Sequence, residues 1–108
     1  MGEVFISSPL RTAIGKYGGS LKDIPAPNLA GYVIKEIIKK TKIDPEIFDD
    51  VIIGNVVLAG EKMNPARQAA IFGGISNNVP AMTVNRVCGS GLQAIISGIM
   101  EIESGYSK

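Results

Sequence analysis

The sequence predicts an α/β fold with a parallel sheet that is covered by helices on both faces. Short, continuous runs of β-branched and apolar residues are typical of buried strands. Segments with apolar residues at helical spacing alternate with these runs, and Asn, Pro or Gly stands where several of the helices should begin or end. The expected order is strand, helix, strand, helix, strand, helix (βαβαβα).

The first half of the chain supplies one strand and one long helix. Residues 4–6, Val-Phe-Ile, predict a short buried strand, and residues 11–27, rich in Gly and Pro, predict a loop. Asn28 is expected to cap a helix over residues 29–40, with two lysines in the last turn, where cations suit the helix dipole. Residues 44–46, Asp-Pro-Glu, predict the start of a second, short helix.

In the second half of the chain, predicted strands and helices alternate more clearly. Residues 51–58 predict the second strand, and Asn64-Pro65 predicts the start of a helix through residue 72 that a glycine pair ends. Residues 82–87 predict the third strand. The helix after Cys88 is predicted by apolar residues at offsets 0, 3, 4, 7 and 8, and Gly105 stands at the expected C-terminal cap.

The predicted fold is apparently incomplete. Three strands leave two sheet edges and part of a helix face unpaired, which small domains tolerate poorly. In an α/β sheet the last helix is expected to lead into another parallel strand. We therefore expect the sheet to be completed by further strands or by another chain.

The composition excludes several classes of protein. Hydrophobic residues make up 45% of the 108 residues and charged residues 19%, which favours a packed core over disorder. A net charge of +1 without a basic stripe argues against a nucleic-acid partner. The N-terminal residues contain neither a basic leader nor an apolar run long enough for a membrane span. We expect a cytoplasmic protein with no membrane partner.

The counts of cysteine and histidine exclude several kinds of metal site and catalytic site. One cysteine cannot form an internal disulfide, and there is no histidine. A zinc cluster, a Cys–His dyad and a Ser–His–acid triad are therefore excluded within this chain, and no metal site is expected.

The single cysteine, Cys88, is the candidate catalytic residue. It follows a predicted strand and precedes a predicted helix, and the sites of open α/β sheets gather at that edge. The first helical turn offers free backbone N–H groups and the positive end of the helix dipole, which favours a thiolate. Gly89, Ser90 and Gly91 form the supporting turn, in which the glycines leave room for a substrate and N–H groups can hold an oxyanion.

Two other interpretations of this stretch stay open from position and spacing alone. A lone cysteine is often a small buried hydrophobe. Residues 89–94, GSGLQA, also match the G-x-G-x-x-A pattern of a dinucleotide-binding loop. The acidic residue that would confirm that pattern would stand after the next strand, beyond residue 108.

Four motifs, in order along the chain, resemble the thiolase family. Residues 85–94, NRVCGSGLQA, resemble the signature around the family's acyl-accepting cysteine. Residues 11–21, RTAIGKYGGSL, resemble its N-terminal loop, residues 51–56, VIIGNV, its second strand, and residues 64–70, NPARQAA, the helix that follows. The biosynthetic type, which forms acetoacetyl-CoA, is the most similar.

The resemblance implies an acetyl-CoA acetyltransferase whose nucleophile is Cys88. Residues 1–108 would be the N-terminal part of a thiolase N-terminal domain, without its later strands and without the C-terminal half of the family fold. Cys88 would take the acyl group from a coenzyme A thioester, and its backbone N–H would be one donor to the oxyanion. A second acyl-CoA would then attack in a Claisen condensation, and the reverse reaction is thiolysis.

The resemblance also implies partners. Acetyl-CoA and acetoacetyl-CoA are the expected substrates, with no cofactor and no coenzyme A-binding residues within this chain, and family members form dimers or tetramers. The family also uses a histidine and a second cysteine from its C-terminal half, which this chain lacks. We therefore expect the 108 residues alone to be inactive.

Three hypotheses of function follow. The first is the nucleophile-bearing part of a thiolase, either a fragment or one chain of a split enzyme that a complementary chain completes. The second is a non-catalytic truncated subunit that acts as an interaction module. The third, a dinucleotide-binding half domain, depends on residues 89–94 alone.

Overall fold

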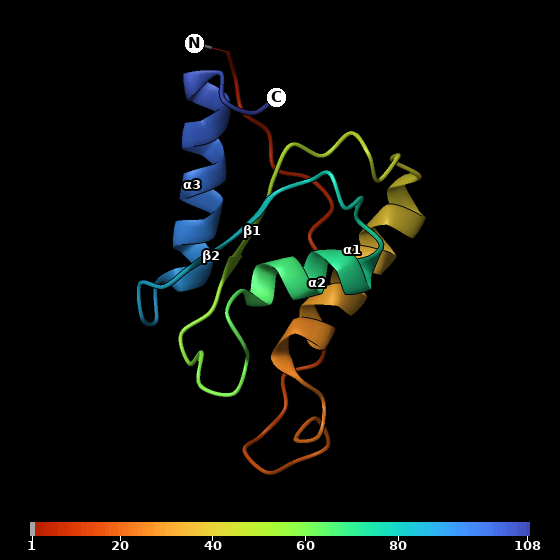
Figure 1. Cartoon of the computed structure of the whole chain (residues 1–108), viewed down its shortest axis with the longest axis vertical. Coiled ribbons are helices and arrows are strands. Elements are labelled where there is room, and N and C mark those ends of the chain that lie inside the picture. Colours follow the sequence, from red (N-terminus) through yellow and green to blue (C-terminus); the bar gives the residue numbers. More distant parts are fainter. Residues whose placement is uncertain (1) are drawn as a thin grey trace.

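The computed structural model describes residues 2–108 and has an α/β fold with a parallel sheet, as predicted. Its elements are, in order, α1 (Ala26–Thr41), β1 (Val51–Gly54), α2 (Pro65–Gly73), β2 (Ala81–Val84) and α3 (Ser90–Ser104). The two strands pair in parallel from Val51 opposite Ala81 to Gly54 opposite Val84, and α2 connects them. Figure 1 shows α3 on one side of the strands, with α1 and α2 on the other.

The alternation of side chains along β1 explains why helices cover both faces. Val51 packs against a buried cluster of Ala70, Ile75 and Val79, together with residues of α1. The next residue, Ile52, points to the opposite face, where its Cδ1 would lie 3.9 Å from a Cβ added to α3 at Gly98. The prediction of helices on both faces is therefore confirmed.

Helices α1 and α2 approach each other closely because small residues lie at their contact. A Cβ added at Gly31 of α1 would lie only 3.1 Å from Cβ of Phe72 of α2. The ring of Phe72 also meets Tyr32 edge to face, with centroids 5.2 Å apart and planes at 87°. Lys35 places its ammonium 5.5 Å from the centroid of the Phe72 ring. Through this contact α1 packs on α2, and α2 in turn packs against β1.

Two of the predicted elements are wrong. Residues 4–6 form no strand, since no other strand of the described chain pairs with them, and Phe5 is 81% exposed. Residues 44–46 form a turn rather than a helix. The Asp44 carboxylate accepts from the N–H of Glu46 at 3.0 Å, and its carbonyl accepts from Ile47 at 3.1 Å, so the segment closes as a turn before a helix can begin.

The ends of three further elements differ from those expected. Helix α1 begins at Ala26, so Asn28 lies in its first turn instead of capping it. A proline is compatible with the first turn of a helix, which explains why Pro27 does not delay its start. The strands are shorter than predicted, because β1 ends at Gly54 rather than 58 and β2 at Val84 rather than 87.

Candidate active site

Cys88 lies in the turn between β2 and α3, at the edge where both parallel strands end. Figure 1 shows that this turn and the loop after β1 lie at the same end of the sheet. The cysteine is free and exposed, which argues against its interpretation as a buried hydrophobe. The expected place of the cysteine, after a strand and before a helix, agrees with the structure.

Gly54 determines how closely α3 approaches the end of β1. A Cβ added at this position would lie 2.6 Å from the backbone nitrogen of Gly91, closer than real Cβ contacts occur. Because the neighbouring atoms belong to the backbone, they cannot rotate away as a side chain could. A glycine inside a strand often marks such a close approach of two backbones. Gly54 thus allows the first turn of α3 to rest against the sheet edge.

The buried side chain of Ser90 stabilises the turn by hydrogen bonds to its backbone. Its side chain is only 3% exposed, and its hydroxyl donates to the carbonyl of Val87 at 2.6 Å. The same hydroxyl accepts from the N–H of Arg86 at 2.9 Å. Both backbone groups belong to the two residues before the cysteine, so Ser90 holds the turn while the Cys88 side chain stays exposed.

Asn85 joins the turn to the loop that follows β1. Its side-chain amide donates to the carbonyl of Val56 at 3.2 Å, and its side-chain oxygen accepts from the N–H of Val87 at 2.9 Å. The second bond, from residue i+2 back to an asparagine, is an Asx turn. Our sequence analysis did not assign Asn85 a role, although an asparagine directly after a strand is a signal for such a turn.

Val87 has an unfavourable backbone conformation. Its φ is +47°, in the left-handed region that a β-branched residue rarely adopts. A residue held there costs about 1–3 kcal/mol and persists only where the surrounding contacts determine its conformation. The contacts to its N–H and carbonyl come from Asn85 and Ser90. Val87, directly before the cysteine, is therefore strained, and hydrogen bonds to its N–H and to its carbonyl hold it in this conformation.

Hydrogen-bond donors and open space lie beside the thiol. Within residues 2–108 the N–H of Cys88 has no hydrogen-bond partner, and α3 has no side-chain cap at its N-terminus. A Cβ added at Gly91 would meet no atom within 4 Å, so the approach over the first turn is open. Within the turn, the N–H groups of Gly89 and Ser90 donate to the carbonyls of Arg86 at 3.0 Å and Val87 at 3.1 Å, so the free donor beside the thiol is the N–H of Cys88 itself, with clearance at Gly91.

A second polar group at this sheet edge is the side chain of Asn55, directly after β1. Its backbone N–H continues the ladder by donating to Val84 at 3.0 Å. Its side-chain nitrogen is buried and has no hydrogen-bond partner within residues 2–108. A buried donor without a partner is unusual in a folded protein. The sequence analysis did not single out this residue.

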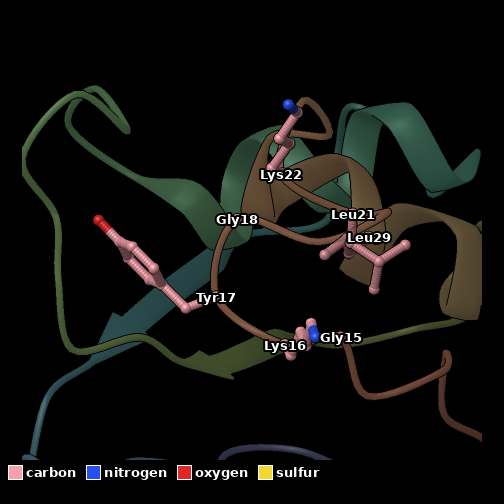
Figure 2. Close-up of a pocket in the computed structure, with 7 residues that line it drawn as sticks. All are labelled: Gly15, Lys16, Tyr17, Gly18, Leu21, Lys22 and Leu29. Atoms are coloured by element: carbon pink, nitrogen blue, oxygen red, sulfur yellow. The ribbon is translucent and has the colours of Figure 1, made fainter.

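Cys88 lines none of five cavities in the described residues, although one of about 110 Å³ is lined by Gly54 and Asn55 at the same sheet edge. One of about 570 Å³ is formed by the turn over residues 15–22 and by Leu29 of α1. Figure 2 shows the Tyr17 ring and Leu29 on opposite sides of this turn, and Cys88 is not among the lining residues. Among residues 2–108, no group of three or more His, Cys, Asp or Glu side chains could hold a metal ion.

In the described part of the chain, no helix combines the length and apolar character needed to cross a membrane.

Comparison with known proteins identifies the family. The sequence model described as thiolase, N-terminal domain, matches residues 4–108. The chain belongs to the thiolase family. An acetyl-CoA acetyltransferase of Cupriavidus necator is 50% identical over 105 residues. A probable acetyl-CoA acyltransferase of Staphylococcus aureus is 49% identical over the same length, and one of Staphylococcus epidermidis 48%.

The thiolase match covers almost all of this chain but a minor part of its relatives. The alignments span 97% of the chain and 27% of the length of each of these relatives. The resemblance inferred from four motifs is therefore confirmed at the level of the family.

Proposed function

We propose that this chain carries the nucleophile of an acyl-CoA acyltransferase of the acetyl-CoA C-acetyltransferase type. The observation that carries the proposal is the exposed Cys88 at the C-terminal edge of a parallel sheet, beside its own N–H, which has no partner within residues 2–108. Support comes from the thiolase family and from relatives named for acetyl-CoA chemistry. The proposed substrates are acetyl-CoA and acetoacetyl-CoA, used without a resident cofactor.

In the proposed first step, the Cys88 thiolate attacks the carbonyl carbon of the thioester. A new carbon–sulfur bond forms, and the carbonyl oxygen becomes an oxyanion that the Cys88 N–H can stabilise. The intermediate collapses when the bond to the coenzyme A sulfur breaks. That sulfur leaves with the electron pair, and the acyl group stays on Cys88.

The second step needs groups that these 108 residues do not contain. The nucleophile must be activated and the second acyl-CoA must be deprotonated at its α-carbon. The family resemblance assigns the first role to a histidine and the second to another cysteine. The chain has no histidine and no other cysteine. We therefore propose that residues 1–108 are the first part of a thiolase N-terminal domain and are inactive alone. We expect the chain to form a homo-dimer or tetramer, or to pair with a complementary chain that supplies the histidine and the second cysteine.

A complementation assay tests this function. The chain is mixed with the C-terminal part of the Cupriavidus necator relative, and thiolysis of acetoacetyl-CoA is followed. Activity should be absent for either polypeptide alone, should appear in the mixture and should be lost with Cys88→Ser. Activity that survives Cys88→Ser would contradict the proposal, as would turnover by the chain alone.

The second candidate function is an interaction module without catalysis. It is favoured by the exposed apolar side chains of α3, among which Leu92 is 65% and Met100 60% exposed. An apolar helix face of this kind marks a surface that binds other protein. If this candidate is right, the mixture above forms a complex but remains inactive. The third hypothesis, a dinucleotide-binding half domain, gains no support from membership of the thiolase family.

A further inference from the structure

We propose that Asn85 is a positioning residue for Cys88, an inference that rests on the proposed function. The three residues Asn85, Val87 and Ser90 form what we call the elbow clamp. The clamp holds Val87 in its left-handed conformation, and this conformation sets the direction of the Cys88 N–H and thiol. Asn85 would thus act on the acyl-transfer step without touching the substrate.

The first observation is that both backbone polar groups of the strained residue Val87, its N–H and its carbonyl, are hydrogen-bonded within the clamp. The N–H of Val87 donates to the side-chain oxygen of Asn85 at 2.9 Å, and its carbonyl accepts from Ser90 at 2.6 Å. The φ of +47° is one that valine does not prefer. Strained residues of this kind persist only where the surrounding contacts determine their conformation, and they cluster at functional sites.

The second observation is that the clamp is anchored to a different strand. The side-chain nitrogen of Asn85 donates to the carbonyl of Val56, in the loop that follows β1. Residue 85 therefore links the loops after both parallel strands, 29 positions apart in sequence. A turn fixed at two points is more rigid than one closed only by its own hydrogen bonds, and rigid support of this kind is what precise placement of a nucleophile requires.

The third observation concerns the Cys88 N–H, whose direction depends on the conformation of Val87. The Cys88 N–H follows the Val87 carbonyl in the same peptide unit, so rotation about Val87 swings both groups together. This N–H has no partner within residues 2–108. A free donor stabilises an oxyanion only when it points at the position that the oxygen will occupy. Loss of the clamp should therefore impair acyl transfer more than it impairs simple reactivity of the thiol.

The test compares two reactions of Cys88 in the full 108-residue chain. Acyl transfer from S-phenyl thioacetate passes through an oxyanion, and its leaving thiolate needs no acid catalyst. Alkylation by iodoacetamide forms no oxyanion. Asn85→Ala should slow acyl transfer about tenfold or more and change alkylation by less than about twofold. The matched control, Asn78→Ala, removes another exposed asparagine and should change neither rate.

A rescue variant separates positioning from stability. Asparagine enters the left-handed region far more readily than valine. Val87→Asn should therefore restore most of the acyl-transfer rate in the Asn85→Ala background. The double variant also decides the outcome if circular dichroism shows that Asn85→Ala alone does not fold.

The outcomes distinguish the two levels of the proposal. A parallel loss of both reactions, no loss of acyl transfer, or no rescue by Val87→Asn would overturn the positioning role and leave the proposed function standing. A wild-type chain that is alkylated at Cys88 but is acylated there neither alone nor with the C-terminal part of the Cupriavidus necator relative would overturn the proposed function, and the positioning role with it.

Discussion

At the scale of single residues, position 54 controls where the candidate nucleophile lies. The Gly54 backbone lies so close to the start of α3 that no side chain fits between them. The same helix begins two residues after Cys88. The absence of a Cβ atom at Gly54 therefore allows α3, and with it the turn that carries Cys88, to lie close to the end of β1.

Gly54→Ala should destabilise the chain by about 1–3 kcal/mol, because backbone atoms of Ser90 and Gly91 would have to move. The measurement is the free energy of unfolding from a urea titration followed by circular dichroism.

The control for this variant is Gly98→Ala, in the middle of α3. There the nearest atom to an added Cβ is 3.9 Å away, and alanine is a better helix former than glycine by about 1 kcal/mol. This variant should be neutral or stabilising. Equal effects of the two substitutions would show that the close approach at Gly54 is not what limits the packing of α3.

At the scale of elements, the start of α2 is held to β2 by a small polar network. Asn64 caps α2 by accepting from the N–H of Arg67 at 3.2 Å, and it donates to the carbonyl of Ala81 at 3.0 Å. Thr83 donates to the same Asn64 oxygen at 2.6 Å. The NPARQAA motif therefore fixes how the crossover helix meets the strand that leads to Cys88.

Arg67→Ala should destabilise the chain by about 1–3 kcal/mol, because its guanidinium donates to the carbonyls of Val79 at 2.8 Å and Asn77 at 3.1 Å. Those carbonyls belong to the loop between α2 and β2. The thermal midpoint is the measurement, and Arg11→Ala is the control, since within residues 2–108 the Arg11 side chain bonds only to the carbonyl of its own neighbour. A midpoint that falls no further for Arg67→Ala than for Arg11→Ala would contradict this role.

The opposite end of the sheet holds two carboxylates close together. Burial raises the pKa of Asp50 above its ordinary value of 3.8, the N–H of Val51 lowers it, and the negative charge of Glu101 raises it again. A raised pKa means that the folded state binds the proton more tightly than the unfolded state. This contribution to stability is complete below pH 3.8 and is lost as the pH rises through the folded-state pKa.

Asp50→Asn should therefore raise the free energy of unfolding at pH 7 and leave it unchanged near pH 3. The asparagine oxygen can still accept the bond that Val51 donates to Asp50. Urea titrations at the two pH values measure the difference, with Asp23→Asn, in an exposed turn, as the control. A variant that is equally stable relative to wild type at both pH values would contradict the raised pKa.

The sequence predicted the helices better than the strands and the turns. Local signals determine the cap at Asn64 and the left-handed glycine at 105, and both agree with the structure. Residues 4–6 have the composition of a strand, but a strand exists only with a partner, which composition does not report. The elbow clamp was not predicted either, because Asn85 bonds to Val56, far away in sequence.

At the scale of the whole molecule, little apolar surface is fully buried. Among residues 2–108 the buried hydrophobic side chains are three alanines, Ile75 and Val79. Many large apolar side chains of α3 are exposed, and the helix carries no charge before Glu101. The molecule therefore presents a broad apolar face next to its candidate nucleophile, as expected of a surface that binds other protein.

This face should make the isolated chain self-associate. Sedimentation velocity should show a larger species as concentration rises. The double variant Leu92→Gln and Met100→Gln should shift the distribution toward monomer, because it removes the two most exposed large apolar side chains of α3. A matched change on another face, Ile14→Gln, should not. A chain that remains monomeric at every concentration would contradict a role of this face in association.

The central claim is that Cys88 accepts an acyl group, and mass spectrometry tests it most directly. The chain is incubated with acetyl-CoA, with and without the C-terminal part of the Cupriavidus necator relative, and its peptides are mapped. We predict one acetyl group on Cys88, formed in the presence of the second polypeptide and absent from Cys88→Ser. An unmodified Cys88 in an otherwise active mixture, or acetyl transfer to another residue, would contradict it.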